Sequence, residues 1–237
     1  MDNIEYLKKY YKGNIEDAIK RLENGEPVQY IVGNHDFYGY ILNVDKRVLI
    51  PRRETEELVE EVIKRAKNFN NLKIVDIATG SGAIAISLSK ELNTKVIATD
   101  ISLDAIDVAY DNIKNNNANV EILHGDMLEP LINNNLKVNI LVSNPPYIKE
   151  NEKIEKIVYN NEPHIALFAK EEGIEFYRKI LKDSNKILED KFLIAFEIGE
   201  TQGNVVRELA YKYLKEIKVD IKQDLSGKDR MVFVYNY

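Results

Sequence analysis

The chain opens with apolar side chains at helical spacing. Apolar residues recur mostly every three or four positions through residues 1–24, which predicts one or two amphipathic helices around Gly13. The apolar positions are Ile4, Leu7, Tyr11, Ile15, Ala18, Ile19 and Leu22. We therefore expect residues 1–24 to form a short helical head.

Residues 25–54 follow a different pattern. β-Branched and aromatic residues alternate there with glycine and asparagine, a composition typical of short strands joined by tight turns. The predicted strands lie around 28–31, 37–42 and 47–49. Residues 25–54 are therefore expected to form a β-hairpin linker region.

The main domain is expected to span residues 55–237 and to begin with a helix. The Thr55 hydroxyl can cap this helix, and Glu56 and Glu57 suit its positive end. Its apolar face consists of Leu58, Val59, Val62, Ile63 and Ala66.

From Lys73 onward, short apolar runs alternate with amphipathic segments. This alternation predicts right-handed βαβ units and a parallel sheet, and hence an α/β fold. The predicted strands are 74–78, 96–99, 120–123, 138–143, 192–197, 216–222 and 231–235, the last two as an antiparallel pair. The predicted helices follow Gly82 and span 102–114, 173–188 and 201–214.

The composition fits a globular protein with one catalytic domain and a small appendage. The chain has 237 residues, of which 44% are hydrophobic and 30% charged, so wholesale disorder is excluded. No apolar run approaches the roughly 18 residues that span a bilayer, and residues 1–11 lack a signal-peptide core. We therefore expect a cytoplasmic protein with no membrane partner.

Residue types and net charge limit the chemistry. The chain has no cysteine and three scattered histidines, which exclude thiolate nucleophiles and argue against a metal site or a catalytic triad. A cofactor must then supply any difficult chemistry. The net charge of −6 disfavours nucleic acid as a direct substrate, because such proteins usually gain affinity by neutralising phosphates.

A glycine-containing loop, residues 78–82, leads from a buried strand into a helix. Its backbone can approach a ligand at the positive helix end, and residues 80–85 satisfy the G-x-G-x-x-G/A pattern. Asp100, about 20 residues after Gly80, is placed for ribose hydroxyls. The pattern does not separate NAD from S-adenosylmethionine. The structural alternatives are a plain strand-to-helix turn and, for Asp100, a helix-capping role.

Three further residues lie near the expected carboxyl end of the sheet. Asp76 can hold the loop or meet a cationic amine of the ligand. Asp126 can accept a hydrogen bond from an adenine amino group, and Met127 can cover the adenine ring. An ordinary loop carboxylate and a core methionine are the alternatives for the last two.

A second motif, Asn144-Pro145-Pro146-Tyr147, ends the predicted central strand beside the topological switch point. Two prolines remove N–H donors and stiffen the backbone, so the Asn144 side-chain oxygen and the Pro145 carbonyl form an array of acceptors. Such an array can hold an amide or aromatic amino group and aim its nitrogen at an electrophilic methyl. Tyr147 can stack on that group and attract a sulfonium charge. A surface Pro-Pro turn is the alternative. Glu197, at another strand end, is expected to be satisfied by backbone donors.

With these residues the sequence resembles the class I S-adenosylmethionine-dependent methyltransferases, and within them the protein-(glutamine-N5) methyltransferases of the HemK/PrmC family. The resemblance runs from about Gly25 to the C-terminus. It is carried by residues 25–31, 37–39, 48–56, 78–82, 144–148, 162–167, 196–199 and 224–230.

The resemblance implies a fold and a reaction. The fold is a Rossmann-like, seven-stranded, mostly parallel sheet with an antiparallel last strand. The reaction transfers a methyl group from S-adenosyl-L-methionine to the amide nitrogen of the glutamine in the Gly-Gly-Gln motif of peptide chain release factors, which act in translation termination.

The resemblance also implies roles for individual residues. Asn144, Pro145 and Tyr147 are the expected catalytic residues, and together with Pro146 they hold the substrate. The cofactor contacts that it implies are residues 78–82, Asp100 and Met127. With Asp76, Asp126 and Asn144, which their positions at strand ends suggest, the expected cofactor residues are Asp76, Ala78, Thr79, Gly80, Ser81, Gly82, Asp100, Asp126, Met127 and Asn144. Two positions depart from the family pattern, since Ala78 stands where glycine is usual and Arg53 where proline is usual.

Three other functions are compatible with parts of the sequence. An adenine-N6 nucleic-acid methyltransferase shares the Asn-Pro-Pro-Tyr motif, but the acidic net charge argues against it. A non-catalytic cofactor-binding scaffold is supported slightly by Ala78 and opposed by the intact motif at 144–147. A dehydrogenase explains the glycine loop and leaves that motif unexplained.

Overall fold

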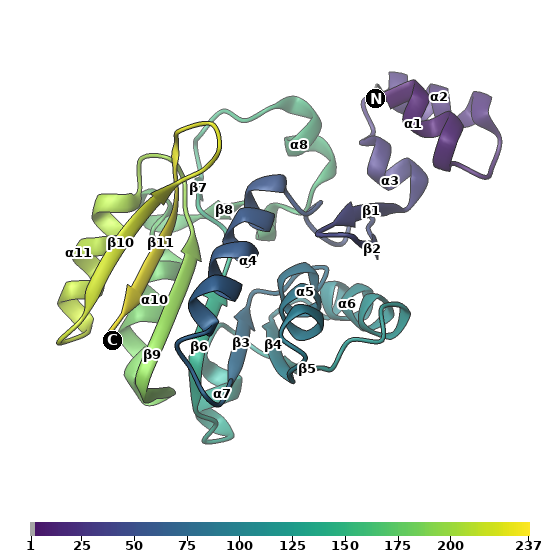
Figure 1. Ribbon diagram of the computed structural model, residues 1–237. Coiled ribbons are helices and arrows are strands. Elements are labelled where there is room, and N and C mark those ends of the chain that lie inside the picture. The colour runs from purple at the N-terminus through teal and green to yellow at the C-terminus, as the bar shows by residue number, and fades with distance from the viewer. Residues whose placement is uncertain (1–2) are drawn as a thin grey trace.

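A seven-stranded sheet forms the centre of the computed structural model, which describes residues 3–237 (Figure 1). Met1 and Asp2, the first residues of the expected head, lie outside this range. The strand order is β10-β11-β9-β6-β3-β4-β5. The strands are β3 (Ile74–Ile77), β4 (Val96–Asp100), β5 (Val120–His124), β6 (Val138–Ser143), β9 (Leu188–Glu197), β10 (Lys218–Gln223) and β11 (Asp229–Tyr235).

The strand directions confirm the predicted fold class. Strand β11 is antiparallel to both of its neighbours, β9 and β10, whereas the pairs β3-β4, β4-β5, β3-β6 and β6-β9 are parallel. The chain runs outward from β3 to β5 and then returns to β6 on the other side of β3. The switch point therefore lies between β3 and β6, and Asn144 directly follows β6.

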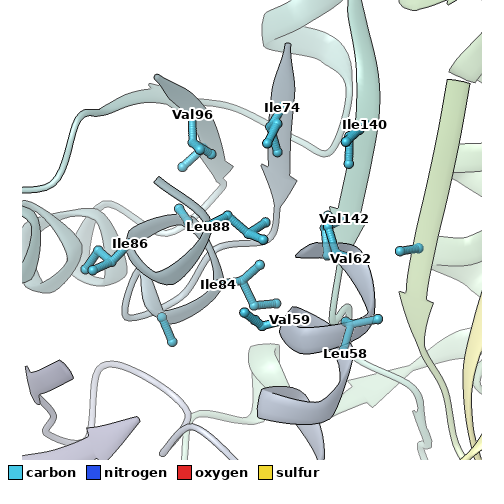
Figure 2. Close-up of a cluster of buried hydrophobic side chains, with 14 of the residues drawn as sticks. Leu58, Val59, Val62, Ile74, Ile84, Ile86, Leu88, Val96, Ile140 and Val142 are labelled. Carbon is cyan, nitrogen blue, oxygen red and sulfur yellow. The ribbon is translucent and has the colours of Figure 1, made fainter. Parts of the chain in front are cut away.

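Helices cover both faces of the sheet because successive side chains of each strand point to opposite sides. On one face lie α4 (Arg53–Ala66), α5 (Ala83–Glu91) and α6 (Leu103–Asn115). Figure 2 shows side chains of α4 and α5 meeting side chains of three strands. Those labelled are Leu58, Val59, Val62, Ile84, Ile86 and Leu88 from the helices and Ile74, Val96, Ile140 and Val142 from the sheet.

The opposite face carries α7 (Glu129–Asn133), α10 (Glu175–Asp183) and α11 (Gly203–Tyr213). The helix predicted at 173–188 is shorter than expected. After α10 the chain forms the 3-10 turn η2 (Ser184–Lys186), and Leu188 already belongs to β9, where it pairs with Val138. The apolar residues 187 and 188 thus serve the junction with the sheet and not a helix face.

The N-terminal segment forms α1 (Asn3–Tyr10), α2 (Ile15–Glu23), α3 (Val28–Val32), β1 (Asn34–Phe37) and β2 (Tyr40–Asn43), beside the sheet (Figure 1). The strand predicted at 28–31 is wrong, because these residues form α3. Val28 and Ile31 are buried against Leu7 and Ala18, and this packing outweighs the β propensity of the segment.

Two more expected strands differ from the structure. The strand predicted at 37–42 is interrupted by a turn at Tyr38 and Gly39, both with positive φ, so that β1 and β2 form a hairpin around it. Residues 47–49 form no strand. Their Val48 is buried beside Tyr30, whose hydroxyl donates to the Val48 carbonyl.

The segment between β6 and α10 passes over the carboxyl ends of the strands. It contains β7 (Ile148–Lys149), α8 (Lys156–Asn161), the 3-10 turn η1 (His164–Ala166), β8 (Phe168–Ala169) and α9 (Lys170–Gly173). Strands β7 and β8 pair in parallel. Within residues 3–237, no helix has the length and apolarity to cross a bilayer.

Candidate active site

Two pockets meet at the carboxyl ends of β3 and β6. The first is lined by the loop after β3, the ends of β4 and β5, and residues from η1 and α10. The second lies on the other side of Asn144 and is lined by Tyr147, Glu197 and Arg230 among others. Asn144 lines both pockets and so stands between them.

The structure distributes the expected site residues between the two pockets. The first pocket is lined by Ala78, Thr79, Gly80, Ser81, Asp100, Asp126, Met127, Asn144 and Pro146. Pro145 and Tyr147 line the second. Asp76 and Gly82 line neither pocket and act on the loop from behind.

The loop between β3 and α5 depends on left-handed backbone conformations. Residues 78, 80 and 82 have φ values of 59°, 55° and 84°. Gly82 must be small, because a Cβ there would lie 3.3 Å from the Ile86 side chain. Ala78 carries a side chain in a conformation that costs a non-glycine residue about 1–2 kcal/mol. The usual family glycine at this position would remove that strain.

Asp100 connects the loop to the pocket. Its Oδ2 accepts a hydrogen bond from the Gly80 N–H (2.8 Å) and its Oδ1 from the Ser102 N–H (2.9 Å). Ser102, and not Asp100, is the N-cap of α6. Burial raises the pKa of Asp100, while these backbone donors favour its ionised form. Each carboxylate oxygen retains a lone pair with which to accept a ligand hydroxyl.

Asp76 holds the loop and has one oxygen to spare. Its Oδ2 accepts from the Thr79 hydroxyl (2.5 Å) and from the Ala85 N–H (3.2 Å). Its Oδ1 is buried without a hydrogen-bond partner among the residues described. Burial raises the pKa of Asp76 to about 7. A carboxylate oxygen left in this state suits a cationic amine placed next to it.

Asp126 and Met127 lie across the first pocket from the loop. Asp126 has the Lys179 ammonium 3.6 Å from its Oδ2. Met127 has a positive φ of 45°, and its carbonyl accepts a hydrogen bond from Thr99. Its side chain packs against the core and also lines the pocket, so the core position is observed, and contact with an adenine ring stays a prediction.

A chain of hydrogen bonds runs behind Asn144. The Asn144 Nδ2 donates to the Thr55 Oγ1 (3.2 Å), and the Thr55 hydroxyl donates to the Glu197 Oε2 (2.5 Å). The Tyr147 hydroxyl donates to the other carboxylate oxygen, Oε1, at 3.4 Å. The expectation that Thr55 caps a helix is wrong, because α4 begins at Arg53 and its N-cap is Arg52. The threonine lies one turn too deep for capping and turns its hydroxyl toward β9.

Glu197 is the buried centre of this hydrogen-bonded group. Burial raises its pKa to about 7, against the opposing effects of the Thr55 hydrogen bond and the positive Arg230. The expectation that backbone donors satisfy this carboxylate is wrong, since its partners are the Thr55 and Tyr147 side chains. In the sequence, the position of Glu197 at the end of a buried strand indicates a possible role in the site. No feature of the sequence indicates such a role for Thr55.

An ion pair joins the entrance of the site to the segment above it. Arg52 Nη2 lies 2.6 Å from Glu162 Oε1, and the Ile50 N–H donates to the other oxygen of Glu162. The next residues after Glu162 include Ile165 and Ala166, which line the first pocket. The residues described contain no group of acidic or histidine side chains arranged to hold a metal ion.

Comparisons with known proteins agree with this geometry. Residues 54–162 match the family model described as "Methyltransferase small domain". The release factor glutamine methyltransferase of Streptococcus pneumoniae is 44% identical over 225 residues, which cover 93% of this chain and 78% of that protein. The corresponding protein of Bacillus subtilis is 42% identical, over 89% of this chain and 75% of that one.

A solved structure supports the same assignment. The release factor-specific protein-(glutamine-N5) methyltransferase of Alicyclobacillus acidocaldarius is 26% identical and superimposes with a TM-score of 0.52, over 79% of this chain and 94% of that chain. The extent and identity of these matches give the conclusion. The chain belongs to the release factor glutamine methyltransferase family.

Proposed function

We propose that this protein transfers a methyl group from S-adenosylmethionine to the side-chain amide nitrogen of the glutamine in the Gly-Gly-Gln motif of peptide chain release factors. The observation that carries the proposal is the position of Asn144, which lines both pockets. A methyl donor on one side and a glutamine on the other then meet at this residue. The names of the relatives support the choice of substrate.

The first pocket fits S-adenosylmethionine. The carboxylate of Asp100 lines this pocket and suits the ribose hydroxyls, whereas Asp76 supports the loop from behind through Thr79 and the Ala85 N–H. Asp126 and Met127 are placed for the adenine. When bound, this cofactor supplies an electrophilic methyl group on a positive sulfur.

The second pocket fits a primary amide. An amide nitrogen is a poor nucleophile because its lone pair is delocalised. The Asn144 Oδ1 and the Pro145 carbonyl can accept its two N–H bonds, which holds the nitrogen toward the first pocket. In this arrangement most of the rate acceleration comes from alignment of the nitrogen and from electrostatic preorganisation. As the bond from nitrogen to the methyl carbon forms, the bond from sulfur to that carbon breaks and S-adenosylhomocysteine leaves, and the nitrogen then releases one proton to solvent. No strong base is therefore required at the nitrogen before the transfer.

Tyr147 forms the wall of the glutamine pocket. Its side chain is partly buried, and its hydroxyl donates a long hydrogen bond to Glu197. Burial and the adjacent Glu197 raise the pKa of the phenol, so it remains neutral at physiological pH. A neutral ring can stack on the planar amide and contribute a cation–π attraction of roughly 0.5 to 2 kcal/mol to a nearby positive charge.

Release factors act in the cytoplasm, and we expect the reaction to take place there.

A labelling experiment tests the proposal. The protein is incubated with S-adenosylmethionine carrying a tritiated methyl group and with a purified release factor, or with a variant release factor in which the Gly-Gly-Gln glutamine is alanine. We expect label in the first substrate and none in the second. Equal labelling of both, or of neither, would overturn the proposal. A parallel incubation with adenine-containing DNA and RNA tests the adenine-N6 alternative, for which we expect no label.

A further inference from the structure

The Asn144 side chain can stand in two orientations, and only one of them suits the proposed substrate. With Oδ1 toward the second pocket it accepts from an amide nitrogen, whereas with Nδ2 there it would present a donor to a donor. The backbone of the Pro-Pro segment does not choose between them, because the two orientations differ only by rotation of the amide. The residues that contact the Asn144 side chain must therefore fix its orientation.

Thr55 determines the orientation of the Asn144 amide, because its hydroxyl has only one proton to donate. That proton is directed to Glu197 Oε2 at 2.5 Å, the strongest acceptor it can reach. The Thr55 oxygen can then only accept a hydrogen bond from Asn144, so the Nδ2 group of Asn144 faces it and donates, at 3.2 Å. The Oδ1 of Asn144 is thereby left for a ligand.

Glu197 directs this arrangement from a buried position. Its carboxylate is 1% exposed and lies between α4, β11 and the segment after β6. The groups that face it are Thr55 and the charged Glu54 from α4, Arg230 from β11, Tyr147, and Tyr177 of α10, whose hydroxyl donates to the Glu197 main-chain carbonyl. Arg230 favours the ionised carboxylate, whereas burial and Glu54 oppose it. An ionised Glu197 can only accept hydrogen bonds, and this keeps the Thr55 proton turned toward it.

We propose that Thr55 and Glu197 are positioning residues that form a relay, with the ionised Glu197 orienting the Thr55 hydroxyl and Thr55 in turn orienting the amide of Asn144 for its substrate. The relay rests on the function proposed above only for the identity of that substrate. A protonated Glu197 can itself donate to Thr55, which frees the threonine proton to turn toward Asn144. Protonation thus permits the reversed, unproductive orientation of the amide.

The relay is tested without any substrate by the side-chain NH₂ signals of Asn144 in ¹⁵N-labelled protein, assigned by their loss in Asn144→Ala. We expect these signals to shift as the pH is lowered from about 8.5 to 5.5, because Glu197 takes up a proton near pH 7. They should shift less in Thr55→Val, which removes only the hydroxyl, and normally in Thr55→Ser, which retains it. Glu197→Gln, which has the same shape, should also remove the pH dependence. An Asn144 signal unchanged by Thr55→Val and still titrating in Glu197→Gln would overturn the relay.

Methyl transfer gives the second readout. In Thr55→Val we expect kcat to fall on the order of 10- to 100-fold, a larger factor than any change in cofactor affinity at the first pocket, which Thr55 also lines, and we expect the acidic limb of the pH–kcat profile to be lost. Thr55→Ser should restore both. The matched control is Thr94→Val. Thr94 precedes the amino end of β4, whereas the site lies at the carboxyl ends of the strands, so this variant should behave as the wild type. Wild-type kcat and pH profile in Thr55→Val would contradict the relay. If the wild type labels no release factor, the proposed function fails, and the NMR result still decides the relay.

Discussion

The two pockets are built in different ways. The first pocket has a local core, since the loop after β3 and the ends of β4 and β5 all fall within residues 78–127, and segments around 47–55, 144–146 and 163–179 complete its walls. The second is lined by side chains from distant parts of the chain, among them Arg52 before α4, Asn144 after β6, Glu197 on β9 and Arg230 on β11. The difference separates a site set by local loop geometry from one set by tertiary packing.

This difference leads to distinct expectations for substitutions. In the first pocket each side chain contributes one of several contacts to a large ligand, so single changes should weaken binding by moderate factors. In the second pocket one side chain aligns the reacting nitrogen, so a single change should remove most of the turnover while leaving cofactor binding intact.

The largest effect is expected for Asn144→Ala. Loss of the acceptor that aligns the nitrogen should lower kcat by about 10²- to 10³-fold, by analogy with removing one preorganised hydrogen-bonding group from an active site. The dissociation constant of S-adenosylmethionine, measured by calorimetry, should change little. Asn133→Ala, at the exposed last residue of α7, serves as the control. Equal losses in kcat and cofactor affinity would show that the two pockets are not separable at Asn144.

A moderate effect of the opposite kind is expected for Asp100→Ala. The loss of charge-assisted hydrogen bonds to ribose, and of the support for Gly80, should weaken cofactor binding by about 1–3 kcal/mol. At saturating cofactor, kcat should stay within a few-fold of wild type. The control is Asp104→Ala, an exposed acid in the first turn of α6. Unchanged affinity would contradict the role given to Asp100.

The pH dependence of stability links the two pockets. Asp76 and Glu197 both have folded-state pKa values raised to about 7, whereas the unfolded carboxyls titrate near 3.8 and 4.5. At these two carboxyls the folded state therefore binds more protons than the unfolded state between these values, and their contribution to the free energy of unfolding should fall as the pH rises from about 4 to about 7 and then level off. Urea titrations across this range measure it.

Asp76→Asn separates the contribution of Asp76, behind the loop after β3, to this slope. The variant should lose part of the slope and be more stable than wild type at pH 8, because it no longer buries a poorly compensated charge. It should also bind S-adenosylmethionine more weakly, since the loop that lines the first pocket loses the carboxylate that holds Thr79 and the Ala85 N–H. A difference in stability between wild type and Asp76→Asn that is the same at pH 4 and pH 7 would show that this carboxyl is not held as described.

The smallest effect is expected for Ala78→Gly. Glycine relieves the left-handed strain at φ 59°, but it also increases the entropy of the unfolded chain. The net gain in the free energy of unfolding should be about 0.5 kcal/mol, measured by urea denaturation. Gly33→Ala is the reverse substitution at another left-handed position, with φ 82° and no atom within 4 Å of the added Cβ. It should destabilise the protein through backbone strain alone. Destabilisation by Ala78→Gly would show that the loop is not strained at this position.

The same contrast explains what could be predicted from the sequence. The strands of the sheet and the loop at residues 78–82 follow from periodicity and from short motifs, because local sequence specifies them. The segment 28–31 could not be predicted correctly, because its burial against Leu7 and Ala18 outweighs its β propensity. Thr55 was missed for a similar reason, since its partner Glu197 lies 142 positions away.

The most direct test of the account is a crystal structure of the protein with S-adenosylhomocysteine and a peptide that contains Gly-Gly-Gln. We expect the product cofactor in the pocket of Asp100 and the glutamine side chain in the pocket of Tyr147, with its amide nitrogen facing the Asn144 Oδ1 and the Pro145 carbonyl. The Asn144 Nδ2 should still face Thr55. A glutamine bound elsewhere, or an Asn144 amide turned the other way, would contradict the claim that this residue joins the two pockets.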